Sequence, residues 1–160
     1  MVRRPSRTVL LLAAALVVAA GLAGAAWFDT HRAQARERAS SEALAAASAA
    51  TPAIFSYDYR GFDASVANGK LFVTGDFATE YAQTTASLKA AAAKEQAVVR
   101  AEVSAAGVVQ ASTAQVEVLL YVNQYRRNVN ITGEKVDQNR VVLTLVPVDG
   151  EWKVSHALAI

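Results

Sequence analysis

The sequence contains no cysteine and only two histidines, His31 and His156, in 160 residues. The absence of cysteine excludes a disulfide framework, a thiolate zinc site, an iron–sulfur cluster and a cysteine nucleophile. Because the two histidines lie far apart in the chain, no histidine-based metal site is expected. No Ser-His-Asp set, paired carboxylates or glycine-rich phosphate motif is recognisable either. We therefore predict no cofactor, no resident metal and no catalytic residue.

A basic surface is also missing once the first residues are set aside. Three of the 16 basic residues, Arg3, Arg4 and Arg7, fall within the first eight positions. Without them, 13 basic residues stand against 14 acidic ones, so the rest of the chain is nearly neutral. Binding to a phosphate backbone requires a basic face. We therefore predict no nucleic-acid partner.

One long hydrophobic run is present, over residues 9–28. It holds 20 residues without a charge, close to the ~20 that a helix needs to cross a bilayer. Trp27 and Phe28 close the run, and aromatic residues are enriched at membrane interfaces. The alternatives are a cleaved signal peptide with Ala23-Gly24-Ala25 as the cleavage site, and a buried soluble helix. We expect a retained membrane helix, because the run is long and aromatic residues follow that site.

Three basic residues lie on each side of this run, and those before it are more closely spaced. Since a long domain translocates largely regardless of its charge, we expect the N-terminus to be cytoplasmic. The chain is thus interpreted as a single-pass protein of the cell membrane. Its expected parts are a basic cytoplasmic tail (1–8), a transmembrane helix (9–28), a helical stalk (29–51) and an extracytoplasmic domain (52–160).

The expected stalk is rich in alanine, arginine and glutamate, which favour helix formation. Leu44 is its only large apolar residue, so the segment lacks the apolar residues of a coiled coil. Weak packing through alanine against a neighbour remains open. Pro52 is expected to mark a boundary or the first turn of a helix.

Two amphipathic helices are expected next, over 62–72 and 75–93. Thr74 or Asp76 can cap the second helix, whereas Asn68-Gly69 weakens the first one locally. The apolar stripes consist of Phe62, Val66 and Leu71 in the first helix and of Phe77, Tyr81 and Leu88 in the second.

From residue 97 onward the apolar period changes to two, which predicts four strands joined by hairpins. Residues 126–138 are polar and are expected to form a loop, and Asp149-Gly150 predicts a hairpin turn. Gly107 is expected to allow a bulge in the first strand. Alternation predicts that the residues of one set in the first strand share a face: Val99, Ala101, Val103 and Ala105. It predicts the same for a set in the last strand: Trp152, Val154, His156, Leu158 and Ile160.

Helices followed by strands indicate an α+β fold. We expect an N-terminal transmembrane helix and a helical stalk, followed by helices packed on a four-stranded curved antiparallel sheet. About 100 residues suffice to enclose one core of this kind.

The string SYDYRGFDASVANGKLFVTGDFATEY, at 56–81, resembles the signature of the mammalian cell entry (Mce)-associated membrane protein family of actinobacteria. VLLYVNQ at 118–124 and RVVLTLVPVDGEWKVS at 140–155 fit the later part of that family. The resemblance covers essentially the whole chain. It implies a cone-like domain of the nuclear-transport-factor-like type, one membrane span, and a position outside the membrane. It also implies an accessory, non-enzymatic role beside Mce systems, which move lipids or sterols through the cell envelope.

Two groups of residues are candidates for a partner interface. Tyr57 and Arg60 belong to residue types that are enriched at binding hot spots. Their alternative role is a structural corner, with Tyr57 and Phe62 in the core, Asp63 capping a helix and Arg60 pairing with a carboxylate. The residues of the second group lie on the same side of one predicted strand. Their alternative role is to form the outer face of the sheet, or a face that the helices cover. The second group consists of Tyr121, Asn123 and Tyr125.

The leading hypothesis is a membrane-anchored accessory protein whose partners are Mce transport complex subunits. The alternative is a lipid- or sterol-binding module that uses the cavity of the cone. An isomerase-type enzyme ranks third, because Glu102 and Glu117 are expected to face solvent and His156 to be structural. A hydrophobic pocket of several hundred Å³ would favour the binding module. A closed core beside an exposed apolar sheet face would favour the accessory role.

Overall fold

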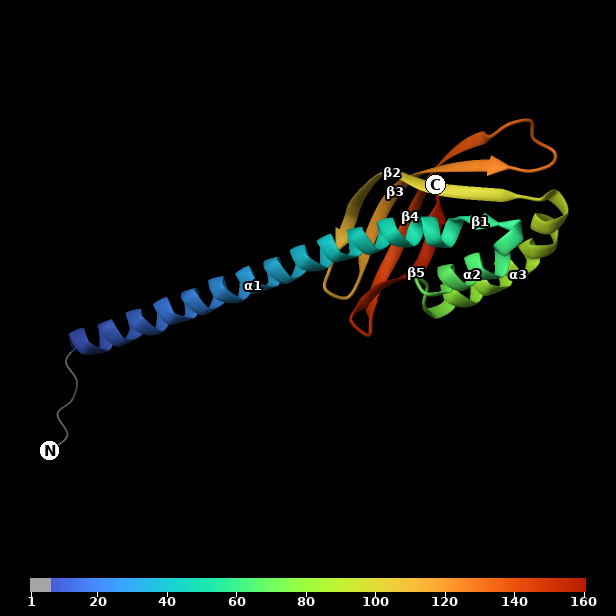
Figure 1. Cartoon of the computed structure of the whole chain (residues 1–160). Coiled ribbons are helices and arrows are strands. Elements are labelled where there is room, and N and C mark those ends of the chain that lie inside the picture. The colour runs from blue at the N-terminus through green and yellow to red at the C-terminus, as the bar shows by residue number, and fades with distance from the viewer. Residues whose placement is uncertain (1–6) are drawn as a thin grey trace. The chain divides into compact units, whose positions relative to one another are not determined.

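The structure, a computed structural model, describes residues 7–160 and divides into two compact units, Met1–Glu37 and Arg38–Ile160. The helix α1 (Arg7–Phe55) begins in the first unit and ends in the second (Figure 1). Most of the predicted cytoplasmic tail lies outside the described residues, as do most side chains of the predicted span. Among the described residues, no helix is both long and apolar enough to cross a membrane. The membrane helix therefore stays a prediction.

The second unit confirms the α+β class, with helices against one antiparallel sheet in the order β1-β2-β3-β4-β5. The sheet has five strands rather than the predicted four, because two residues pair with Val98 and Val99 as an additional edge strand. A strand this short cannot display a period of two. The elements after α1 are β1 (Tyr57–Asp58), a 3-10 turn η1 (Tyr59–Gly61), α2 (Phe62–Lys70), α3 (Gly75–Glu95), β2 (Val98–Ala111), β3 (Val116–Arg127), β4 (Lys135–Val148) and β5 (Glu151–Ala159).

The two predicted amphipathic helices are confirmed as α2 and α3, but Leu71 of the first predicted apolar stripe follows α2 and is 65% exposed. Thr74 occupies the N-cap position of α3, but its side chain makes no capping hydrogen bond. Gly75 follows with φ of +59°, a conformation that glycine adopts without steric cost. A positive φ at this point turns the chain between the two helices.

The last part of α1 packs on the sheet. Its buried residues are spaced three or four apart, which places them on one helical face. Pro52 lies inside α1, in its last turn, and does not mark a boundary. The segment predicted to be a stalk therefore contributes to the compact unit from Arg38 onward. The buried residues of this face are Ala39, Ala43, Ala47, Ala50 and Ile54.

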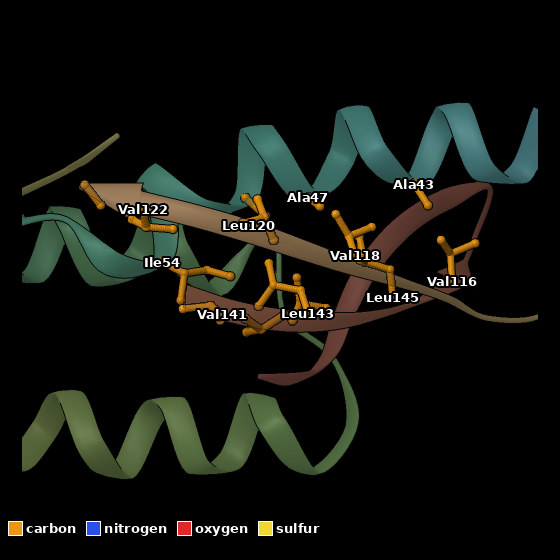
Figure 2. Close-up of a cluster of buried hydrophobic side chains, with 14 of the residues drawn as sticks. Ala43, Ala47, Ile54, Val116, Val118, Leu120, Val122, Val141, Leu143 and Leu145 are labelled. Atoms are coloured by element: carbon orange, nitrogen blue, oxygen red, sulfur yellow. The ribbon is translucent and has the colours of Figure 1, made fainter. Parts of the chain in front are cut away.

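Small side chains on this helix allow it to approach the sheet closely. In Figure 2, Ala47 of α1 lies beside Val118 and Leu120 of β3, and Ala43 lies beside Val116. Leu120, Leu143 and Leu145 have no exposed surface at all. Tyr81 of α3 completes the same core cluster. The sheet face that α1 and α3 cover is called the inner face below, and the opposite one the outer face.

Three predictions about the strands are wrong. β3 extends to Arg127 and β4 begins at Lys135, so only 128–134 form the loop expected over 126–138. The bulges of β2 lie between Val103 and Ala105 and between Val108 and Gln110, not at Gly107. The first bulge moves Ala105 out of the phase of Val103, because one extra residue reverses the alternation.

A third irregularity, in the pairing of β4 with β5, changes the position of His156. Leu145 pairs with Val154, whereas Thr144 pairs with His156, so one residue of β5 is extra. His156 is therefore exposed on the outer face, away from Trp152 and Val154 of the core cluster. The prediction that Trp152, Val154, His156, Leu158 and Ile160 share one face is wrong for this reason, because the extra residue places the last three on the outer face.

Candidate interaction surface

Tyr121, Asn123 and Tyr125 lie on the outer face of the sheet. Their strand neighbours Val118, Leu120 and Val122 point into the core, and successive side chains of a strand alternate between faces. Tyr121 is 46% exposed. The structure thus brings the three predicted residues together on the face that the helices leave open.

An apolar row crosses the outer face next to Tyr121. Leu119 of β3 pairs with Val142 of β4, and Val142 pairs with Leu158 of β5. Leu158 is 53% exposed and Leu119 and Val142 are half-buried. Ile160, also exposed, donates its backbone N–H to the Arg140 carbonyl oxygen. Exposed apolar residues that adjoin one another are typical of interaction surfaces.

Tyr121 also borders a hollow of about 350 Å³, here called the Tyr121 hollow. The bulge of β2 contributes to it, because the Ser104 hydroxyl donates to the Tyr121 carbonyl oxygen at 3.0 Å. Across the hollow, the Gln138 amide nitrogen lies 3.4 Å from the Asn123 amide oxygen. The hollow is lined by Ser104, Tyr121, Val122, Asn123, Gln138, Asn139 and Arg140.

Arg140 and Lys135, which lie in opposite phases of β4, differ from the other cations of the sheet. Arg100 pairs with Glu102, and its guanidinium also lies 4.4 Å from the centre of the Tyr125 ring. Arg140 is exposed and has no ion pair among the described residues. The remaining pairs on the sheet are Arg126 with Asp137, Arg127 with Glu134 and Lys153 with Glu151.

The second predicted group, Tyr57 and Arg60, lies before α2, and Arg60 lines a hollow of about 290 Å³ together with Tyr125 of the first group. Arg60 binds the Asp58 carboxylate with its side chain, at 3.0 Å from Nε to Oδ1. The Tyr57 ring meets the buried Phe62 ring edge-on, with centroids 5.4 Å apart. Asp63 does not cap α2 but binds Lys89 of α3 at 2.7 Å. This arrangement corresponds to a structural corner, apart from the predicted cap.

The corner shifts two pKa values. The hydrogen bonds from the Arg60 side chain lower the pKa of the Asp58 carboxyl to about 2, with further help from the Arg60 backbone N–H. Burial raises the pKa of the Tyr57 phenol. Both Tyr57 and Asp58 line a hollow of about 270 Å³, and both pKa shifts follow from the contacts of the corner.

The residues weighed as catalytic do not converge. His156 is exposed, and Glu102 is exposed and bound to Arg100. Glu117 accepts a hydrogen bond from the Gln115 side chain at 3.4 Å. Among the described residues, no group of three His, Asp or Glu side chains is placed to hold a metal ion.

The inner face of the sheet is filled by side chains. Val116, Val118 and Val154 are fully buried together with the three leucines of the core. A further hollow of about 490 Å³ lies at the surface, where the Trp152 indole N–H donates to Glu42 at 3.3 Å. The middle of the inner face is thus occupied by the core, and the hollow beside Trp152 lies between α1, Phe72 and β5.

Two parts of this surface were missed from the sequence. Arg140 stands in a strand whose alternation is clear, but nothing in one sequence shows that its charge has no partner. Ser104 reaches the Tyr121 hollow only because of a bulge, and no residue type at that point signals the bulge.

Comparison with known proteins gives a fold. No family model matches the chain. The uncharacterized protein Rv1362c of Mycobacterium tuberculosis is 28% identical over 155 residues, which cover 95% of this chain and 70% of that protein.

Two solved structures show the same architecture. An IcmL-like type IV secretion system protein from Legionella pneumophila aligns with a TM-score of 0.61 at 15% identity, over 73% of this chain and 88% of its own. The periplasmic domain of DotI aligns with a TM-score of 0.56 at 16% identity, over 73% of this chain and 91% of its own. At such identities the likeness extends to the fold of the second unit.

Proposed function

We propose that the chain is a non-enzymatic, membrane-anchored accessory protein of an Mce-type lipid or sterol transport complex, with its α+β domain outside the membrane. The observation that carries the proposal is a closed core beside an open apolar sheet face. The inner face is filled by fully buried side chains, while Tyr121 and Leu158 are exposed on the outer face. A surface of this kind fits a protein partner.

The family resemblance supplies the Mce part of the proposal, through Tyr57–Arg60, Thr74–Phe77 and the strand sequences. The fold neighbours support an envelope role in a general way, because one is a secretion system protein and another is a periplasmic domain. The alternative, a lipid-binding module, is less favoured because the inner face is filled by fully buried side chains, and the hollow of about 490 Å³ beside Trp152 is its best candidate site. Catalysis is not favoured, since Glu102 and His156 are exposed and Glu117 is half-buried on another strand.

The proposal is tested by purifying the full-length protein from its native envelope in a mild detergent and identifying both proteins and lipids by mass spectrometry. We expect Mce subunits to copurify. Bound lipid without Mce subunits would support the lipid-binding module instead. Recovery of the protein with neither would contradict both functions.

A further inference from the structure

Arg140 of β4 pairs with Tyr121 of β3 on the outer face and lines the Tyr121 hollow. Within residues 38–160 it has no carboxylate partner, although four other cations of the sheet each have one. A guanidinium binds a carboxylate through two parallel hydrogen bonds. The Tyr121 hollow beside it, of about 350 Å³, is large enough to accept a side chain.

We propose that the outer face binds a segment of a second envelope protein, and that this segment inserts a carboxylate side chain into the Tyr121 hollow, onto Arg140. Apolar side chains next to that carboxylate lie across Leu119, Val142 and Leu158. The inference rests on the proposed function, and it adds the chemistry by which the partner is recognised.

The size and composition of the surface agree with a protein partner. β3 has 12 residues, which at ~3.4 Å each span ~40 Å. Across β2 to β5 the outer face is ~15–20 Å wide, so its area approaches the ~800 Å² per partner of a standard interface. Tyrosine and arginine at the centre of a patch are typical of hot spots.

A lipid surface is less suited to this face. Proteins that bind anionic membranes use clusters of about 4–8 basic residues. On the outer face, Arg140 is the one cation among the described residues of the sheet strands that has no ion pair, and its neighbours in the hollow are the uncharged side chains of Tyr121, Asn123 and Gln138. One carboxylate satisfies such a site.

A second copy of this chain is also less suited. Two-fold pairing through this face would bring each Arg140 close to the equivalent residue of the other copy. On this face Glu102 of β2 is already paired with Arg100, and Glu117 lies near the start of β3, four residues from Tyr121, so no free carboxylate lies beside Arg140. The partner is therefore a different protein.

The test uses photo-crosslinking in the native envelope. Full-length protein with benzoylphenylalanine in place of Leu158 is irradiated, and the crosslinked peptide is identified by mass spectrometry. The yield is compared between this protein and versions that also carry Arg140→Glu, Arg140→Lys or Lys135→Glu. Lys135→Glu is the matched control, because Lys135 is exposed on the same strand in the opposite phase.

We expect a peptide of another envelope protein with Asp or Glu within a few residues of the crosslink. Arg140→Glu should lower the yield at least ~10-fold, since it places like charges together. Arg140→Lys should lower it less, because the charge remains without the planar fork. Lys135→Glu should leave the yield within about twofold. Exchanging the partner's carboxylate for arginine should restore the yield with Arg140→Glu.

Four results would overturn the inference: no crosslink, a crosslink to phospholipid alone, a crosslink to a second copy, or a yield that Arg140→Glu leaves unchanged. The proposed function fails separately. An Arg140-dependent crosslink to a protein outside the Mce system would support the inference and contradict that function. Copurification of Mce subunits that does not depend on Arg140 would support the proposed function and contradict the inference.

Discussion

At the scale of single residues, Gly69 shows how the sequence can mislead. A glycine near the end of a helix suggests local weakness. In the structure, however, a Cβ on Gly69 would overlap the Tyr81 hydroxyl and lie 2.9 Å from the Ala53 carbonyl oxygen. The glycine lets α2 pass close to α1 and α3. No property of the neighbouring sequence reveals that approach.

Gly69→Ala should therefore destabilise the domain. An added methyl group in a helix is normally favourable by about 1 kcal/mol, but overpacking costs about 1–3 kcal/mol. We expect a net loss of stability, measured by urea unfolding. Gly107→Ala is the control, because no atom lies within 4 Å of a Cβ at that position, and it should not destabilise. Equal stability of both variants would contradict the close packing of Tyr81.

Asp58 gives a prediction about pH. Its pKa is lowered from 3.8 to about 2 in the folded protein by Arg60. A carboxyl with a lowered pKa stabilises the fold above its unfolded pKa, and this stability is lost as pH falls from about 4 to about 2. Arg60→Ala should flatten the stability curve in that window, and NMR titration should return the Asp58 pKa toward its ordinary value. An unchanged titration would contradict the pairing.

At the scale of elements, period and turn signals predicted α2, α3 and four of the five strands, together with the hairpin at Asp149-Gly150. The faces of β2 and β5 could not be predicted throughout, because bulges reverse the alternation and leave no mark in composition. The role of α1 was missed for another reason. Alanine favours a helix whether the helix is exposed or buried, so the buried stripe looked like a stalk.

Ala47→Leu tests the packing of α1. Ala47 is fully buried against the sheet (Figure 2), so three added carbon atoms should cost about 1–3 kcal/mol. Ala45→Leu, at an exposed position of the same helix, should change the stability by less than about 0.5 kcal/mol. Thermal and urea unfolding of the two variants measure the difference. If Ala47→Leu is as stable as Ala45→Leu, the segment is a stalk after all.

At the scale of the whole molecule, the second unit combines a closed core with one open sheet face. The sequence predicted Tyr121, Asn123 and Tyr125 as candidates because their phase is amphipathic, and the structure places them on that open face. Tyr57 and Arg60 are held by contacts within a structural corner. The outer face is thus the stronger candidate, and partner binding there is the central claim.

The most direct test of this claim is capture of Mce subunits from the native envelope by the full-length protein and two tyrosine variants. Tyr121→Ala removes the exposed ring of the outer face and should reduce capture by at least ~30-fold, as expected for a hot spot of about 2 kcal/mol. Tyr59→Ala, in the turn before α2, should leave capture unchanged. Absence of Mce subunits with the unaltered protein, or equal capture by Tyr121→Ala, would contradict the account.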